Sequence, residues 1–182
     1  MPEKYSFPYR RGWTLVLNYL HDAGTTPETH TRHYSLPIKG SDVLGTDESG
    51  TAYWGHAAPG LLNNMDFSSM RWYCTTSSDS QVMHFMSTDT DMIDYARTGQ
   101  GNDKMSGVEG SATTFADHTA TWGDAGWKDN QGDSALTDHP LYTSGSRYWN
   151  INPAGSAGRW ECDDYDVGGG GDYDTIHRIW VQ

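Results

Sequence analysis

Short apolar runs with β-strand character alternate with long polar stretches along this chain. Residues 13–20 (WTLVLNYL) predict a buried strand, because the run is rich in aromatic and aliphatic side chains. Residues 69–76 and 80–87 predict a strand pair, since the polar turn SSDS separates two β-rich runs. The other predicted strands, which close the fold, cover residues 146–151, 158–162 and 175–181.

The segments between these runs predict loops and little helix. Residues 22–51 and 88–140 are dense in glycine, proline and polar side chains, which favour turns. Residues 58–65 (APGLLNNM) predict one or two helical turns, with Pro59 near their start. The chain has no repeat at solenoid spacing and no linker-like composition. The pattern therefore predicts one α+β domain over residues 1–182, with more loop than usual.

Composition and charge exclude several function classes. The 182 residues include 24 Asp and Glu against 12 Lys and Arg, which gives a formal net charge of −12. We therefore expect neither nucleic acid nor an anionic membrane surface as a partner, because both need clustered cations. No apolar run approaches the roughly 20 residues that span a bilayer, so we expect no membrane insertion.

Residues 1–13 do not have the features of a signal peptide, because they lack its apolar core of roughly 7–15 residues. An extracellular protein with this sequence then needs another export route or a leader ahead of it, whereas a virion component needs none. The 8 Trp and 11 Tyr are typical of sugar- or protein-binding surfaces, but we expect most of the Trp side chains in the core.

Residues 159–180 gather the strongest local charge. Six carboxylates surround Gly168–Gly171 and repel one another when the backbone is compact. A bound calcium ion offsets that repulsion, because it takes about 6–8 oxygen ligands and glycines let carbonyl groups turn inward. A solvated acidic loop is the alternative. The six carboxylates are Glu161, Asp163, Asp164, Asp166, Asp172 and Asp174.

Four motifs follow one another along the chain in the order found in one known family. Residues 12–20 (GWTLVLNYL) resemble the GGGWTLV opening of fibrinogen C-terminal-like domains, the fold of ficolins and, more distantly, intelectins. Residues 53–74 are similar to an intelectin stretch with a Trp-His pair, residues 128–133 (KDNQGD) to an acidic calcium loop, and Gly168–Gly171 to an intelectin GGGG segment. The sequence departs from the family in its single glycine before Trp13, its lack of local disulfides and its lack of an Asn-Cys-Ala element.

This resemblance implies a fibrinogen C-terminal-like fold of small twisted antiparallel sheets, short helices and extensive Gly/Asp-rich loops. It also favours calcium over a solvated loop. The implied calcium ligands are Asp163, Asp164 and Asp174, then Asp166 and Asp172, with His56 from the Trp-His stretch. Glu161 lies on a predicted strand and is a weaker ligand candidate, and Asp129 and Asp133 are candidates for a second ion. A further cluster, Asp89, Asp91 and Asp94, predicts a solvated loop, because it lacks the EF-hand pattern.

Three functions compete. The first is a calcium-dependent, lectin-like recognition or adhesion domain for a glycan or cell-surface polysaccharide, multivalent through oligomerisation or display on a particle. Its candidate sugar-contacting side chains are Tyr165, Tyr173, Trp122 and Trp127. The second is a non-catalytic structural or decoration protein of a virus or phage particle. The locations that these functions imply are extracellular or on a virion surface.

The third and remote function is a GDSL-type hydrolase. Residues 132–138 (GDSALTD) and Asp174-x-x-His177 resemble that family's blocks and would make a triad of Ser134, His177 and Asp174. The spacing argues against it, because only 43 residues separate Ser134 from His177 and no apolar strand precedes the serine. We therefore expect that the protein is not an enzyme.

The two cysteines share the pattern Arg-Trp-x-Cys, in residues 71–74 and 159–162. On a strand, a Trp and a Cys two residues apart face the same side. If the two strands were neighbours in one sheet, Cys74 and Cys162 could form a disulfide across an 88-residue interval. Two buried free thiols are the alternative, and the matched pattern favours the disulfide.

Overall fold

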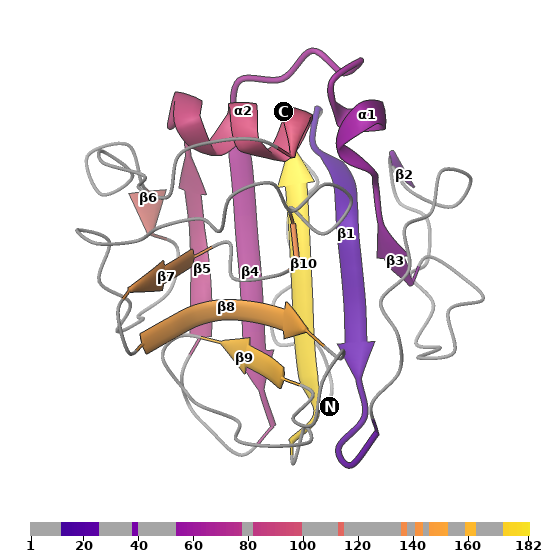
Figure 1. The fold of residues 1–182 in the computed structure, drawn as a ribbon, viewed down its shortest axis with the longest axis vertical. Helices are drawn as coiled ribbons and strands as arrows, with labels where there is room; N and C mark the ends of the chain where they lie inside the picture. The colour runs from indigo at the N-terminus through magenta and orange to yellow at the C-terminus, as the bar shows by residue number, and fades with distance from the viewer. Residues whose placement is uncertain are drawn as a thin grey trace.

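The computed structural model describes residues 12–25, 38–39, 54–77, 82–99, 113–114, 136–137, 141–143, 146–152, 159–162 and 173–182. These residues form mostly antiparallel sheet with two short helices, as Figure 1 shows. Among them, no helix is long and apolar enough to cross a membrane.

The large sheet brings the ends of the sequence together at its centre. Its strand order is β2 (Ile38–Lys39), β1 (Thr14–His21), β10 (Thr175–Val181), β4 (Met70–Thr76), β5 (Val82–Ser87) and β6 (Thr113–Thr114). The short strand β3 (Gly55–His56) also pairs with β1. Every pair in this sheet is antiparallel. The strands predicted at residues 13–20, 69–76, 80–87 and 175–181 are therefore confirmed.

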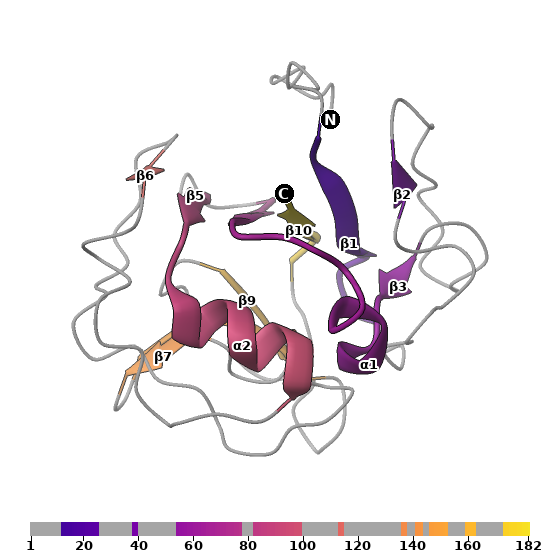
Figure 2. The same cartoon turned by 90° about the horizontal axis from the view of Figure 1, so that it is seen from above.

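A second, smaller sheet crosses the large one. It consists of β7 (Leu141–Thr143), β8 (Ser146–Asn152) and β9 (Arg159–Cys162), which confirms the predicted strands at 146–151 and 158–162. Figures 1 and 2 place this sheet and both helices on the same face of the large sheet. We call that side the inner face and the opposite side the outer face. The core therefore lies between the two sheets and under the helices.

Alternation along β4 shows how the sequence assigns side chains to the two faces. Met70, Trp72 and Cys74 are fully buried on the inner face, whereas Arg71 and Tyr73 between them are half-buried on the outer face. Of the eight Trp residues, the structure describes six. Four of them are fully buried in the core, as expected from the sequence: Trp54, Trp72, Trp149 and Trp160.

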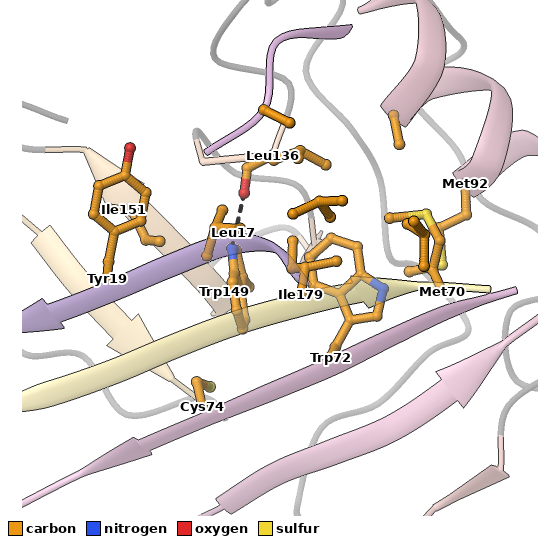
Figure 3. Close-up of a cluster of buried hydrophobic side chains, with 14 of the residues drawn as sticks. Leu17, Tyr19, Met70, Trp72, Cys74, Met92, Leu136, Trp149, Ile151 and Ile179 are labelled. Atoms are coloured by element: carbon orange, nitrogen blue, oxygen red, sulfur yellow. Dashed lines mark hydrogen bonds between the residues drawn. The ribbon is translucent and has the colours of Figure 1, made fainter. Parts of the chain in front are cut away.

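Trp149 of β8 connects the two sheets at the centre of this core (Figure 3). Its ring lies edge-on to Trp72 of the large sheet, with ring centroids 5.0 Å apart. Its indole Nε1 donates a hydrogen bond to the carbonyl of Leu136 at 3.1 Å. An edge-to-face aromatic pair adds stabilisation beyond the area it buries. Trp149 therefore packs the two sheets together through its ring contact with Trp72 and holds the Leu136 segment through its N–H.

The first helix was expected and the second was not. Helix α1 (Pro59–Leu62) begins at Pro59, as the sequence predicts. Helix α2 (Thr90–Thr98) lies in the stretch that we expected to be mostly loop, so that part of the prediction is wrong. The side chain of Asp89 caps α2 by accepting from Met92 N–H at 3.0 Å, and Gly99 ends the helix with φ 67°. The expected solvated loop at Asp89, Asp91 and Asp94 is therefore a cap and an exposed helix face.

A disulfide joins Cys74 of β4 to Cys162 of β9, with their Cα atoms 5.8 Å apart. The two strands are not neighbours in one sheet, as the sequence argument assumed. They belong to different sheets, and the bond crosses the core between them. Both cysteines are almost fully buried, as are Trp72 and Trp160, their partners in the Arg-Trp-x-Cys pattern.

Candidate functional site

Asp174 ties together the ends of three strands of the large sheet. Its carboxylate Oδ1 accepts from the backbone N–H of Ala23, just beyond β1, at 2.9 Å. Its own N–H donates to Ser77 Oγ at 3.2 Å, and Ser77 N–H donates to the Asp174 carbonyl at 2.9 Å, just beyond β4. The Asp174 side chain is nevertheless exposed. We call the group Ala23, Ser77, Tyr173 and Asp174 the Asp174 end.

The Asp174 end presents a carboxylate that is already oriented toward solvent. A carboxylate has about four lone-pair positions, and the Ala23 amide occupies one of them, so the others can accept a cation. Asp22, which is also exposed, begins a turn in which Thr25 Oγ1 donates to the Asp22 carbonyl at 2.8 Å. Tyr173 is half-buried next to Asp174 in the sequence. This end therefore combines an oriented carboxylate with a partly accessible aromatic side chain.

Of the predicted calcium ligands, the structure describes only Asp174 and His56. No group of three or more His, Cys, Asp or Glu side chains arranged to share a metal ion occurs among the described residues. Glu161 lies on β9 opposite Asn150. The remaining candidates lie outside the described residues: Asp163, Asp164, Asp166, Asp172, Asp129, Asp133, Tyr165, Trp122, Trp127 and Ser134.

His56 lies away from the Asp174 end. It pairs with Leu17 across β3 and β1, whereas Asp174 bonds to Ala23 beyond the other end of β1. The four residues from Leu17 to His21 already span about 13 Å along a strand. His56 is buried, and its Nδ1 forms a hydrogen bond of 2.5 Å with the hydroxyl of Tyr19. The described contacts therefore give His56 a structural partner in the core.

Histidine and aromatic rings also fill the space between β1, β10 and β9. The Trp160 ring stacks on His21, with centroids 4.3 Å apart and planes 6° apart. Trp160 also lies 5.9 Å from the Tyr19 ring and 6.2 Å from the His177 ring. All four side chains are buried. This group packs β9 against the large sheet and offers no exposed ring to a ligand.

The two described members of the hydrolase-like triad, His177 and Asp174, lie in different environments. His177 is fully buried on the inner face, edge-on to Trp149 with centroids 4.5 Å apart. Asp174 is exposed, and its carboxylate accepts from Ala23. A buried histidine of this kind has no access to a substrate, which weighs against the hydrolase alternative.

The outer face carries a cationic group that the sequence analysis missed. Arg71 donates from Nε and Nη2 to Nε2 of His84, at 3.0 and 2.9 Å, and its guanidinium lies 5.2 Å from the centroid of the Trp180 ring. In the next row, buried Arg178 donates to Asn18 Oδ1 at 3.0 Å. Strand register places Arg71 opposite Trp180 and Arg178 opposite Tyr73. In the sequence, the only signal for this group is the alternation of side chains along β4 and β10, which places Arg71, Tyr73, Arg178 and Trp180 on the outer face.

His84 makes this group sensitive to acid. Burial, followed by the neighbouring Arg71 charge, lowers the pKa of His84 from 6.5 to about 4. The neutral ring can then accept the guanidinium hydrogen bond at Nε2. The folded state therefore resists protonation that the unfolded chain accepts near pH 6.5. This contribution to stability is complete above that pH and is lost as pH falls toward 4.

We expect the free energy of unfolding to decrease by about 1–3 kcal/mol more in the unaltered protein than in His84→Gln between pH 7 and pH 4. Glutamine keeps an acceptor oxygen for Arg71 but does not titrate. Urea denaturation across this pH range measures the difference and cancels the effect of carboxylates common to both proteins. Parallel pH curves for the two proteins would contradict the assignment.

No family model, no curated protein and no solved structure matches this chain. The functional argument therefore depends on the residues and geometry described above.

Proposed function

We propose that the protein is a calcium-dependent carbohydrate-binding domain with a fibrinogen C-terminal-like fold. The observation that carries this proposal is the Asp174 carboxylate, exposed at the end of the large sheet and oriented by Ala23. Asp174 lies two residues beyond the acidic, glycine-rich segment of residues 163–172. A carboxylate that is already held in place loses little conformational entropy when it binds a cation. The proposed site is centred on Asp174 and does not use His56.

Sugar recognition would take place beside the ion. Calcium can coordinate a vicinal diol directly, because it accepts additional oxygen ligands in flexible geometry. Tyr173, half-buried next to Asp174, would supply the apolar face for the sugar ring, with Tyr165 on the other side of the glycine run. A glycan or cell-surface polysaccharide is therefore the proposed partner. Several copies, in an oligomer or on a particle, would raise the weak affinity of one site.

The disulfide supports a location outside a reducing compartment. Such bonds persist mainly in secreted proteins and on cell or virion surfaces. Cys74–Cys162 crosses the core and links the two sheets, so the fold includes it as a structural element. This agrees with a protein that works extracellularly or on the surface of a virus particle.

Calcium is expected to stabilise the protein through Asp174. An ion that binds only the folded state adds about 2.7 kcal/mol at one hundred times its dissociation constant, or roughly 5–10 °C in Tm for a chain of this size. EDTA should remove this gain. In Asp174→Asn, the amide oxygen can still accept from Ala23, so the melt in EDTA should change little while the response to calcium is lost.

The matched control is Asp94→Asn on helix α2, where an exposed carboxylate of the same charge lies outside the site. This variant should respond to calcium like the unaltered protein. Thermal melts with calcium and with EDTA, together with elemental analysis, test the proposal. An identical melt in both buffers and no bound metal would rule calcium out.

A glycan array in calcium then tests the sugar. Binding that disappears in EDTA and in Asp174→Asn supports a lectin. A calcium-stabilised protein that binds no glycan would instead favour the second function, a structural or decoration protein of a virus or phage particle.

A further inference from the structure

A row of polar side chains crosses the inner face of the large sheet next to the Asp174 end. Strand register places His21 of β1 opposite Thr175 of β10, and Thr175 opposite Thr76 of β4. Side chains directly opposite one another in antiparallel strands have Cβ atoms about 5 Å apart. Trp160 of β9 covers this row by stacking on His21. Four strands from both sheets thus bring polar atoms together in the interior.

Three polar atoms of this group have no hydrogen-bond partner among the described residues. They are Oγ1 of Thr76, Oγ1 of Thr175 and Nε1 of Trp160. Their residues are only 4%, 1% and 0% exposed, so bulk solvent does not reach them. Buried polar groups in folded proteins nearly always have a partner, and a bare one destabilises the fold. Three such atoms, on two paired threonines and on the ring that stacks on their neighbour His21, therefore point to a bound molecule.

We propose that internal water binds here and bridges Trp160 of the small sheet to Thr76 and Thr175 of the large sheet. The chemistry of the three atoms selects the ligand. An indole N–H only donates, so it cannot ligate a metal ion, whereas a hydroxyl both donates and accepts. Water matches this set, because it accepts from Trp160 and exchanges hydrogen bonds with both threonines. A small anion would also accept from these donors, but the net charge of −12 disfavours it.

The Asp174 end adjoins this row along the three strands of the large sheet. Asp174 directly precedes Thr175, Ser77 directly follows Thr76, and Ala23 lies two residues beyond His21. Hydrogen bonds join Asp174 to both Ala23 and Ser77. The proposed water therefore lies between the hydrogen-bonded Asp174 end and strand β9. It adds a polar link between the sheets to the Cys74–Cys162 bond and the ring contacts of Trp149 and Trp160.

Thr76→Val and Thr175→Val test the proposal, because valine keeps the branched shape of threonine and replaces its hydroxyl with a methyl group. If the hydroxyls bind water, each variant should lower Tm by roughly 2–5 °C. The double variant should lower it by less than the sum, because both residues hold the same water. Thr75→Val is the matched control, since Thr75 is half-exposed on the outer face of the same strand, and should change Tm by less than about 1 °C.

A crystal structure determined at high resolution from a bromide-containing solution completes the test. We expect water density within about 3.2 Å of Trp160 Nε1 and at least one threonine hydroxyl. A higher Tm in both valine variants would overturn the proposal, because it would mean that the hydroxyls are bare. Anomalous bromide density at this position would overturn it in favour of an anion.

Discussion

Replacing both cysteines, by Cys74→Ala with Cys162→Ala, is expected to lower the free energy of unfolding by about 4 kcal/mol. The bond joins residues 88 apart, and closing a loop of this length restricts the unfolded chain by that amount in the chain-entropy model. Domains of this kind have only about 5–15 kcal/mol of stability in total. The bond also joins two sheets, so its loss removes a constraint across the core.

Urea denaturation with and without a reductant measures this effect. The reductant should shift the unfolding midpoint of the unaltered protein but not that of the double-alanine variant. That variant is the control for other effects of the reductant, because it has no disulfide to reduce. Alkylation without reductant should modify no cysteine in the unaltered protein, as judged by intact mass. Two alkylated cysteines and an unchanged midpoint would show that the bond is absent in solution.

Trp149→Ala is expected to lower the free energy of unfolding by about 3–5 kcal/mol, because it leaves a cavity where the two sheets meet. It removes the edge-on contact with Trp72 and the hydrogen bond to Leu136, whose carbonyl is left without this donor. Trp149→Phe keeps a ring and loses the N–H, and should cost about 1–2 kcal/mol. The difference between the two variants separates packing from hydrogen bonding.

Trp13→Ala provides the comparison at the surface. Trp13 is only half-buried and packs against the small cluster of Leu15 and Trp180 on the outer face. Its truncation to alanine should lower the free energy of unfolding clearly less than the truncation of Trp149 does. Equal costs in urea denaturation would contradict the inference that the two sheets share one core centred on Trp149.

Local sequence patterns predicted the strands well, because each long strand carries its own apolar residues. Helix α2 was missed although its signals are present. Asp89 supplies an N-cap, Met92, Ile93 and Ala96 form an apolar stripe, and Gly99 marks the end. The helix has only nine residues and lies among polar residues that favour turns, so composition outweighs this short periodicity.

The spatial relations were harder to predict than the elements. The Arg-Trp-x-Cys repeat suggested the cysteine pair, but not that its strands belong to different sheets, because pairing between distant segments leaves no local signal. For the same reason, the tie from Asp174 to Ala23 and the Arg71–His84 pair became visible only in three dimensions. Of the candidate site, the sequence predicted Asp174 as a calcium ligand and Tyr173 as a sugar contact, and both roles stay predictions.

The central pairing of β1 with β10 has a consequence for synthesis on the ribosome. Asn18 and Arg178, which bond across these strands, are 160 residues apart in sequence. While the chain grows, β1 and β4 have no strand between them, and each exposes unpaired backbone groups and apolar side chains. The sheet can close only after β10 leaves the exit tunnel. Until then, cotranslational folding is limited to local pieces such as the β4–β5 pair, and the nascent chain depends on protection from aggregation until β10 emerges.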